Sequence, residues 1–175
     1  LAFEMIAEKN YSIKPNKKII LLKKLAECAG HVGIAGGQFL DLNYEKRKVS
    51  RSKIVEMQKK KTGKLFEFCC LAPAIIAGAN KKTKRDMCSI GEELGLLFQI
   101  TDDLLDIKGN KKNVGKQVKK DKRKGKSTIV DLLGHNKTLE FAFEIKKMIM
   151  NKLKKYGKRS DKLIQTVNFI MSRSY

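Results

Sequence analysis

The chain has 175 residues, of which 42% are hydrophobic and 33% are charged, with a formal net charge of +21. This length is enough for one domain with a buried core, and no apolar run reaches the roughly 18 residues that would cross a bilayer. Arginine supplies only six of the 39 basic residues, whereas nucleic-acid readers rely on arginine forks for phosphates and base edges. We therefore interpret most of the lysine excess as a solvated surface.

The first ten residues, LAFEMIAEKN, contain neither the basic region nor the cleavage site of a secretory signal. Because the chain begins with leucine and not methionine, we expect it to be part of a longer protein. Its four cysteines form no CxxC pair, and its two histidines have no metal-binding spacing. We expect buried, reduced thiols at Cys28, Cys69, Cys70 and Cys88, in a cytoplasmic protein.

Apolar residues recur at helical spacing along most of the chain, and two prolines with no alternating pattern argue against a sheet. The pattern predicts helices over residues 19–29, 54–78, 86–107, 139–156 and 161–172. Pro73 should kink the second of these helices. Polar, basic residues 42–51 are typical of a loop. We expect an all-α bundle that forms a single domain over residues 1–175, without an internal repeat.

Two short motifs stand in the first half of the chain. The sequence GGQFLD covers residues 36–41, after a helix that carries Gly30 and Gly33, and small residues at this spacing let another helix pack closely. Gln38 and Asp41 are one turn apart and could face the same cavity. The sequence KTG, residues 61–63, lies early in the predicted helix 54–78; its lysine is uninformative by itself.

Three aspartates stand in the apolar segment FQITDDLLD, residues 98–106. On a helix, Asp102 and Asp106 share one face and Asp103 lies beside them. Carboxylates this close repel one another unless a cation lies between them, and a hard cation with oxygen ligands, most plausibly Mg²⁺, fits the set. Exposed aspartates at a helix end are the alternative, but the apolar neighbours indicate a packed helix whose carboxylates need a partner.

A lysine-rich segment, residues 108–126, follows directly and holds three glycines and nine lysines. Long links of this kind are unusual in a compact bundle and are often functional. Glycines beside lysines let backbone amides and ammonium groups approach a phosphate, so we expect a phosphate-binding loop. It is not a P-loop, because Lys120 stands where that pattern requires glycine.

In their order along the chain, these four motifs closely resemble those of the trans-isoprenyl diphosphate synthases, the farnesyl and geranylgeranyl diphosphate synthases of the bacterial type. GGQFLD resembles the family's GGQxLD and KTGKL its KTGxL. FQITDDLLD with GKQVKKDKRKGKST is similar to its second aspartate-rich motif and the lysines that follow. The tail NFIMSRSY is similar to the end of its last helix. The resemblance implies an isoprenoid-synthase-type helical bundle.

The family's first aspartate-rich motif has no counterpart here, because the sequence contains a single Asp-Asp pair, Asp102-Asp103. The chain therefore resembles the C-terminal half to two-thirds of such an enzyme. The absent portion would carry most of the isopentenyl diphosphate pocket and two of the three Mg²⁺ sites. We expect the 175-residue chain to turn over little by itself, and to be unstable or to dimerise through uncovered apolar faces.

The family's enzymes condense isopentenyl diphosphate with an allylic diphosphate, with Mg²⁺ as cofactor, and are usually homodimers. The resemblance implies that Asp102 binds Mg²⁺ directly, supported by Asp103 and Asp106. It also implies a set of residues that bind the diphosphate or line the reaction cavity: Lys61, Lys116 and Lys126 on the diphosphate, Asp121 orienting the loop, Thr62 and Gln99 near the developing cation, and Phe98, Gln38 and Asp41 along the cavity.

Three other interpretations are open. The chain could be a catalytically impaired or regulatory protein of the same fold, which an upstream DDxxD in the same reading frame would argue against. A related terpene cyclase would also bind metal and diphosphate, but its function would not require the motifs GGQxLD and KTG together. A basic nucleic-acid-binding module would bind duplex DNA in a salt-sensitive way, yet it leaves the three aspartates unexplained, and we expect no nucleic-acid partner.

Overall fold

The computed structural model describes residues 1–9, 12–45, 47–112 and 128–173, the stretch 107–112 by its backbone alone. Every regular element in these ranges is helical, which confirms the expected all-α bundle. The elements, in chain order, are α1 (Ala2–Ala7), α2 (Pro15–Ala29), α3 (Ile34–Tyr44), α4 (Arg51–Gln58), the π-helical turn η1 (Lys59–Gly63), α5 (Lys64–Ile76), α6 (Lys81–Lys112), α7 (Ile129–Leu133), α8 (His135–Leu153), the 3₁₀ segment η2 (Lys154–Ser160) and α9 (Asp161–Ser172).

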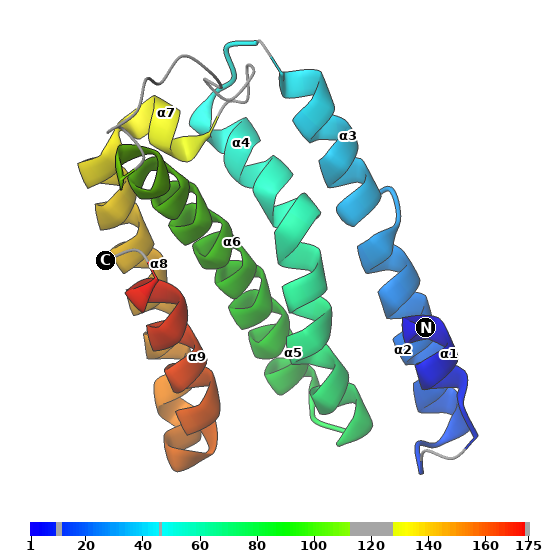
Figure 1. Ribbon diagram of the computed structural model, residues 1–175. Helices are drawn as coiled ribbons and strands as arrows, with labels where there is room; N and C mark the ends of the chain where they lie inside the picture. Colours follow the sequence, from blue (N-terminus) through cyan, green and yellow to red (C-terminus); the bar gives the residue numbers. More distant parts are fainter. Residues whose placement is uncertain (10–11, 46, 113–127, 174–175) are drawn as a thin grey trace.

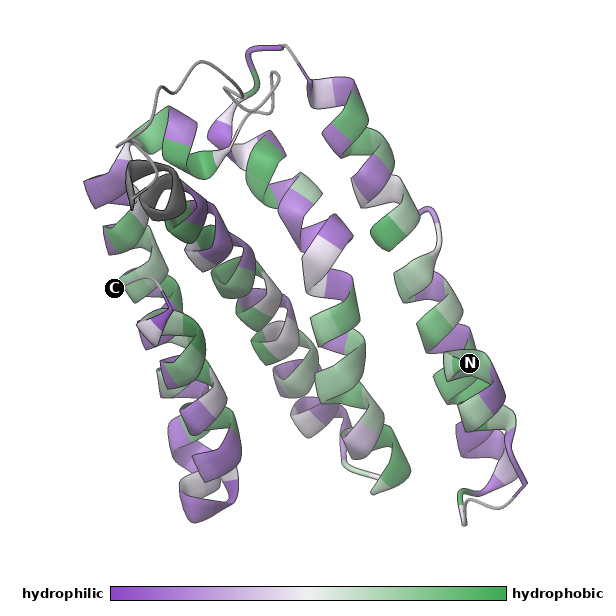
Figure 2. Cartoon of the chain, viewed as in Figure 1, coloured by the Kyte–Doolittle hydropathy of each residue, from purple (hydrophilic) through white to green (hydrophobic). Residues whose placement is uncertain are grey.

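The long helix α6 runs through the middle of the molecule, with α5 along one side and α8 and α9 along the other (Figure 1). Helix α2 packs on the far side of α5, and α3 continues from it toward the end of the bundle where α4 and α7 lie (Figure 1). The lower part of α5 is hydrophobic almost all round (Figure 2). A helix of that kind needs neighbours on several sides, and α2 and α6 provide them.

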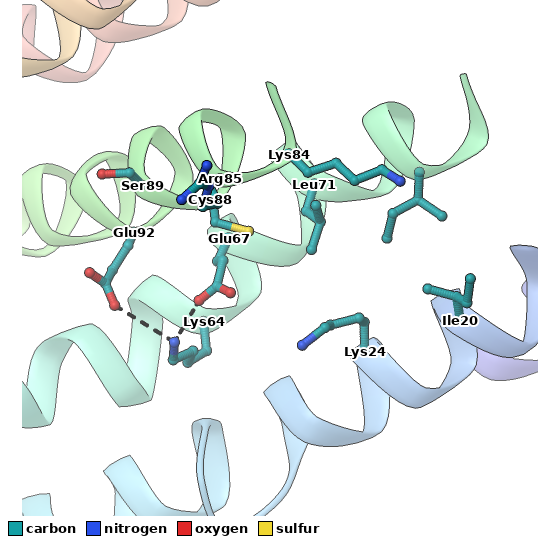
Figure 3. A pocket seen from close by; sticks show the side chains of 11 residues that line it. Ile20, Lys24, Lys64, Glu67, Leu71, Lys84, Arg85, Cys88, Ser89 and Glu92 are labelled. Atoms are coloured by element: carbon teal, nitrogen blue, oxygen red, sulfur yellow. Dashed lines mark hydrogen bonds and ion pairs between the residues drawn. The ribbon is translucent and has the colours of Figure 1, made fainter. Parts of the chain in front are cut away.

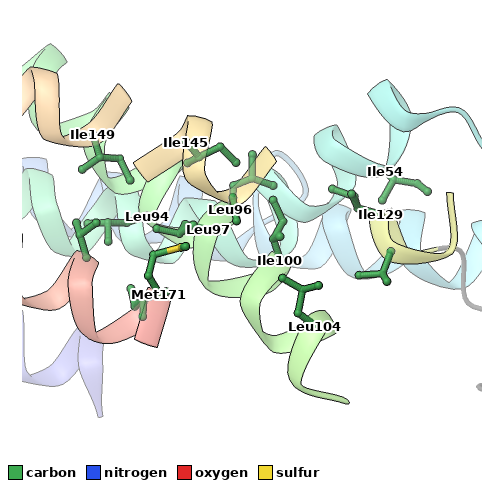
Figure 4. Close-up of a cluster of buried hydrophobic side chains, with 14 of the residues drawn as sticks. Ile54, Leu94, Leu96, Leu97, Ile100, Leu104, Ile129, Ile145, Ile149 and Met171 are labelled. Atoms are coloured by element: carbon green, nitrogen blue, oxygen red, sulfur yellow. The ribbon is translucent and has the colours of Figure 1, made fainter. Parts of the chain in front are cut away.

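The main hydrophobic core lies where α6 meets α8 and α9. Leu94, Leu97, Ile100 and Leu104 of α6 are almost fully buried. They pack with side chains of the later helices (Figure 4), which include Ile145, Ile149, Val167 and Met171. A smaller cluster of Leu21, Leu71 and Ile75 joins α2 to α5. The main cluster fixes the direction of α6, and therefore the direction of the acidic motif near its end.

Several predicted boundaries hold, and several are wrong. The helix predicted over 161–172 is confirmed by α9. The motif GGQFLD lies inside α3 and does not follow a helix, because the chain breaks at Gly30–Gly33 and then resumes helical structure. Helix α6 begins before residue 86 and continues through Lys112. The first five residues of the segment 108–126 are therefore helical, and the rest lie outside the described ranges.

The cysteines are all free, as expected, but their burial was predicted wrongly for three of the four. Cys28 is buried, Cys70 and Cys88 are partly buried, and Cys69 is exposed. Cys69 and Cys70 are neighbours on α5 and point in different directions. Burial raises the pKa of the Cys70 thiol to about 11, so this thiol stays protonated near neutral pH.

In the part of the chain that the structure describes, no helix has both the length and the apolar character of a membrane span.

Candidate active site

Three helices meet closely around the KTG motif, and two glycines allow it. A Cβ atom on Gly37 of α3 would lie 2.3 Å from the backbone nitrogen of Lys61. A Cβ atom on Gly95 of α6 would lie 2.6 Å from the Cα of Gly63. Real Cβ atoms do not come this close to backbone, so both positions require glycine. The turn that carries Lys61 and Thr62 is therefore held between α3 and α6.

This turn is π-helical and interrupts what would otherwise be one continuous helix from α4 to α5. Single π-helical turns within α-helices are frequent at functional sites. The extra residue changes the direction of the side chains in the turn relative to α-helical spacing. The sequence predicted the motif, but gave no sign of this turn.

Lys61 forms an ion pair with Asp41 of α3. The ammonium nitrogen lies 2.6 Å from a carboxylate oxygen of Asp41, whose side chain is 11% exposed, whereas the lysine side chain is 33% exposed. A lysine that is held by a nearly buried carboxylate and still reaches solvent can also contact an anion from outside. The two motifs GGQFLD and KTG thus meet at this pair.

Thr62 lies in a line of hydrogen bonds with α6. The Thr62 hydroxyl donates to Oε1 of Gln99 over 3.2 Å, and Nε2 of Gln99 donates to Oδ1 of Asp103 over 3.2 Å. Nε2 of Gln58 donates to the other carboxylate oxygen of Asp103, also over 3.2 Å. Because the Gln99 amide donates to a carboxylate, its carbonyl oxygen must point the other way, toward Thr62.

The adjacent aspartates Asp102 and Asp103 have different environments. Asp103 is 5% exposed and accepts from two amide groups. The side chain of Asp102 is 43% exposed, and one of its oxygens lies 3.3 Å from Nη2 of Arg173. Asp106, one turn beyond Asp102 on the same face, is exposed. Asp102 and Asp106 are thus accessible to an external ligand, and Asp103 belongs to the interior.

Within the described ranges, no three His, Cys, Asp or Glu side chains gather as a metal-binding group. A Mg²⁺ ion does not require such a group, because it is usually bound by one or two carboxylates together with waters and substrate phosphates. The exposed face of Asp102 and Asp106 fits this kind of binding. It does not fit a cage made by the protein's own side chains.

Phe98 lies one turn before Asp102 on α6. Its ring centroid is 5.6 Å from that of Phe66 on α5. The guanidinium carbon of Arg173 lies 4.9 Å from the Phe98 ring centroid, on its face. Phe98 is therefore held between α5 and the residue that follows α9, and forms an apolar surface beside the aspartates.

A cavity of about 520 Å³ opens between α2, α5 and α6 (Figure 3). Lys64 of α5 lies across it, 2.6 Å from Glu67 and 3.7 Å from Glu92. Burial lowers the pKa of Lys64, but the hydrogen bond to Glu67 and the charges of Glu67 and Glu92 raise it more, so the net pKa lies above its usual value. None of the predicted site residues that the structure describes lines this cavity.

The structure brings most of the predicted site residues into one region at the meeting of α3, η1 and α6. Lys61 pairs with Asp41, and a separate line of hydrogen bonds joins Thr62, Gln99 and Asp103. Gln38 is exposed, and no hydrogen bond links it to either group among the described residues. That Gln38 and Asp41 line the same cavity stays a prediction. Lys116, Asp121 and Lys126 lie outside the described residues.

Two residues of the site were missed in the sequence. Gln58 has a signal that could have identified it, because it is a polar residue one turn before Thr62 and next to the core residues Ile54 and Met57. Arg173 is a single cation at the end of the last amphipathic helix, a pattern that by itself indicates nothing. Only the packing of α9 on α6 brings it to Asp102.

Comparisons with known proteins agree with this arrangement. A family model described as Polyprenyl synthetase matches residues 1–168. A farnesyl diphosphate synthase of Geobacillus stearothermophilus is 34% identical over 82% of this chain and 50% of its own length. Geranylgeranyl pyrophosphate synthase 4 of Arabidopsis thaliana is 34% identical over 100% of this chain and 48% of its own.

Among solved structures, an FPP/GFPP synthase from Zymomonas mobilis superposes with a TM-score of 0.83 at 32% identity, over 97% of this chain and 56% of that one. The chain thus spans about half the length of the curated relatives it matches.

Proposed function

This chain belongs to the polyprenyl synthetase family, and from that premise we propose that it forms part of a trans-prenyltransferase. The reaction would join isopentenyl diphosphate to an allylic diphosphate, such as dimethylallyl or geranyl diphosphate, and yield a longer prenyl diphosphate. The observation that carries this proposal is the meeting of the Lys61–Asp41 pair and the Thr62–Gln99–Asp103 line beside the accessible carboxylate of Asp102.

The chemical difficulty of this reaction is the departure of a diphosphate group that carries about three negative charges. Lys61 offers an ammonium group that is anchored by Asp41 and still accessible. Asp102 and Asp106 would hold Mg²⁺, which when bound neutralises charge on the leaving diphosphate. We further propose that Lys116 and Lys126 bind the same diphosphate and that Asp121 orients their loop. Preplaced cations stabilise the transition state without reorganisation.

Loss of diphosphate leaves positive charge on the allylic carbon, which needs stabilisation without a nucleophile that would trap it. The Gln99 amide and the Thr62 hydroxyl present oxygen dipoles, and the hydrogen bond from Gln99 to Asp103 fixes which end of the amide faces Thr62. The Phe98 ring adds an apolar surface beside them. The oxygen dipoles of Gln99 and Thr62 stabilise the cation because they are held in a fixed orientation. Buried Asp103 supports this by accepting a hydrogen bond from Gln99.

A catalytically impaired or regulatory protein of the same fold is the second candidate. It is favoured by one observation: residues 1–175 hold a single Asp-Asp pair, Asp102-Asp103. Under both proposals the protein would act in the cytoplasm as a homodimer. The two differ in turnover, since purified chain that releases diphosphate from the substrate pair at a measurable steady rate cannot be an inactive relative.

The binding proposal is tested by titration of geranyl diphosphate with and without Mg²⁺, on the unmodified chain and on Asp102→Ala. We expect Mg²⁺ to tighten binding to the unmodified chain, and Asp102→Ala to remove most of that gain. Asp161→Ala, at an exposed aspartate at the start of α9, serves as the matched control and should behave as the unmodified chain. Equal affinity in all four principal conditions would remove the metal–diphosphate interpretation.

A further inference from the structure

The contact of Arg173 with Asp102 occupies one oxygen, Oδ1, of a carboxylate whose side chain is 43% exposed. Arg173 follows the last residue of α9, and α9 packs on α6. Its Nη2 nitrogen lies 3.3 Å from Oδ1 of Asp102, and its guanidinium carbon lies 4.9 Å from the ring centroid of Phe98. Phe98 and Asp102 are one turn apart on α6. The guanidinium is therefore held at two neighbouring points on one helix face.

Each of these two contacts is weak enough to be replaced. The side chains of Arg173 and Asp102 are 30% and 43% exposed, and ion pairs between such groups contribute little because water screens them. The interaction of a cation with an aromatic ring at an exposed position also contributes little free energy. The Arg173–Asp102 contact can therefore be exchanged for another cation more easily than the hydrogen bonds of neighbouring Asp103, one of which is buried and the other partly buried.

A divalent cation and the guanidinium cannot share the accessible side of the Asp102 carboxylate. The guanidinium is bonded to Oδ1, and two cations a few ångströms apart repel each other. Binding of metal to Asp102 therefore requires Arg173 to leave. Because α9 remains packed on α6, the released guanidinium stays close to the site, where its fork of N–H groups can donate to phosphate oxygens.

We propose that Arg173 is a positioning residue that holds the Asp102 carboxylate until a divalent cation displaces it, and that the displaced guanidinium then donates to the bound diphosphate. This inference rests on the proposed function, because it assumes that metal and diphosphate bind at Asp102. It predicts opposite effects of one substitution. Removal of the Arg173 side chain should raise the affinity for a metal ion that binds alone. It should lower the affinity for a diphosphate that binds together with the metal.

The experiment compares the unmodified chain with Arg173→Gln, Asp102→Asn and Arg159→Gln. Arg159 is an exposed arginine of η2, before α9, and its replacement removes the same charge at a distance from Asp102. Calorimetry measures the affinity of each protein for Mg²⁺ alone, and then for inorganic pyrophosphate in saturating Mg²⁺. Circular dichroism verifies that each variant is folded.

For Arg173→Gln we expect Mg²⁺ affinity about two- to fivefold higher, since an exposed ion pair no longer competes. We expect its pyrophosphate affinity to fall about tenfold, since a charge-assisted hydrogen bond is lost. Arg159→Gln should change neither. A residue with a merely structural role would weaken both affinities or neither, and either result would overturn the inference.

The failure of this inference can be told from failure of the proposed function. If Asp102→Asn lowers the affinity for Mg²⁺ and pyrophosphate while Arg173→Gln changes neither, Arg173 has no positioning role and the site itself stands. If Asp102→Asn binds both ligands as the unmodified chain does, the metal–diphosphate site at Asp102 is wrong, and this inference falls with it.

Discussion

Two neighbouring aspartates in this protein have separate environments, because consecutive residues of a helix point about 100° apart. Asp102 turns toward solvent and Arg173, whereas Asp103 turns into the bundle and accepts from Gln58 and Gln99. A buried carboxylate needs hydrogen-bond donors of this kind. The two amides help to hold the Asp103 carboxylate in place, and Asp103 in turn orients the amide of Gln99.

At the residue scale, Gln58→Leu should destabilise the protein. The substitution removes a donor from Asp103, whose carboxylate oxygen is left with one less partner in a buried position. Loss of a hydrogen bond to a buried polar group costs about 1–3 kcal/mol. Part of this is offset, because Oε1 of Gln58 is itself buried without a partner among the described residues. Urea unfolding should therefore show a lower midpoint.

The matched control for Gln58→Leu is Gln165→Leu, at an exposed position of α9. Surface substitutions of this kind change the free energy of unfolding by about 0.5 kcal/mol or less. If both variants unfold at the same urea concentration as the unmodified chain, the hydrogen bond between Gln58 and Asp103 does not contribute to stability.

At the scale of elements, the π-helical turn η1 lies between two helices, α3 and α6. Gly37 lets α3 lie against its backbone, and Gly95 does the same for α6. Lys61 then reaches back to Asp41 of α3, while Thr62 reaches forward to Gln99 of α6. Lys61 and Thr62 can contact helices on opposite sides of the turn because both α3 and α6 lie close to it. The glycines are therefore part of the site although they carry no functional group.

Gly37→Ala should separate α3 from η1. Alanine normally stabilises a helix by about 1 kcal/mol relative to glycine, but here its Cβ would lie 2.3 Å from the Lys61 nitrogen. We expect net destabilisation of about 1–3 kcal/mol, the range for overpacked positions, and weaker binding of geranyl diphosphate with Mg²⁺. Thermal unfolding and titration measure the two effects.

Ala35→Ser, at an exposed position of the same helix, is the control for Gly37→Ala and should be close to neutral. A Gly37→Ala variant that is more stable than the unmodified chain would show that α3 can move away from η1 without a loss of stability. The close contact would then have no role in holding the turn.

At the scale of the whole molecule, α6 connects the core to the site. One face of α6 carries Leu94, Leu97 and Ile100 into the core with α8 and α9, and the same helix carries the aspartates further along its length. Elsewhere, large apolar side chains remain exposed on α2 and α3. Ile19, Phe39 and Leu42 are 67%, 66% and 58% exposed. Exposed apolar groups that lie one turn apart, such as Phe39 and Leu42, favour association with another surface.

We therefore expect the purified chain to associate in a concentration-dependent manner through α3. The double variant with Phe39→Ser and Leu42→Ser should shift this association to higher protein concentration in sedimentation velocity experiments. Phe169→Ser, which removes an equally exposed ring from α9, is the control and should leave it unchanged. Identical association of all three proteins would exclude this face of α3 as the contact.

The sequence by itself determined the fold class, the family and most of the residues of the candidate site. Helical spacing of apolar residues specifies α9 to the residue, and the motifs GGQFLD, KTG and FQITDDLLD are local patterns that need no tertiary contact to be recognised. The family match confirmed the resemblance on which the site residues were chosen. Such motifs can be recognised in the sequence because each is defined by its residue types and their spacing.

Only the tertiary structure decided how these residues act on one another. The π-helical turn, the separate environments of Asp102 and Asp103, and the approach of Arg173 and Gln58 all depend on which helices pack together. Arg173 and Asp102 are far apart in the sequence, and no periodic pattern links them. Their contact follows from the direction of α9 on α6, which buried side chains along both helices fix together. Such contacts come from packing, and packing is a property of the whole bundle.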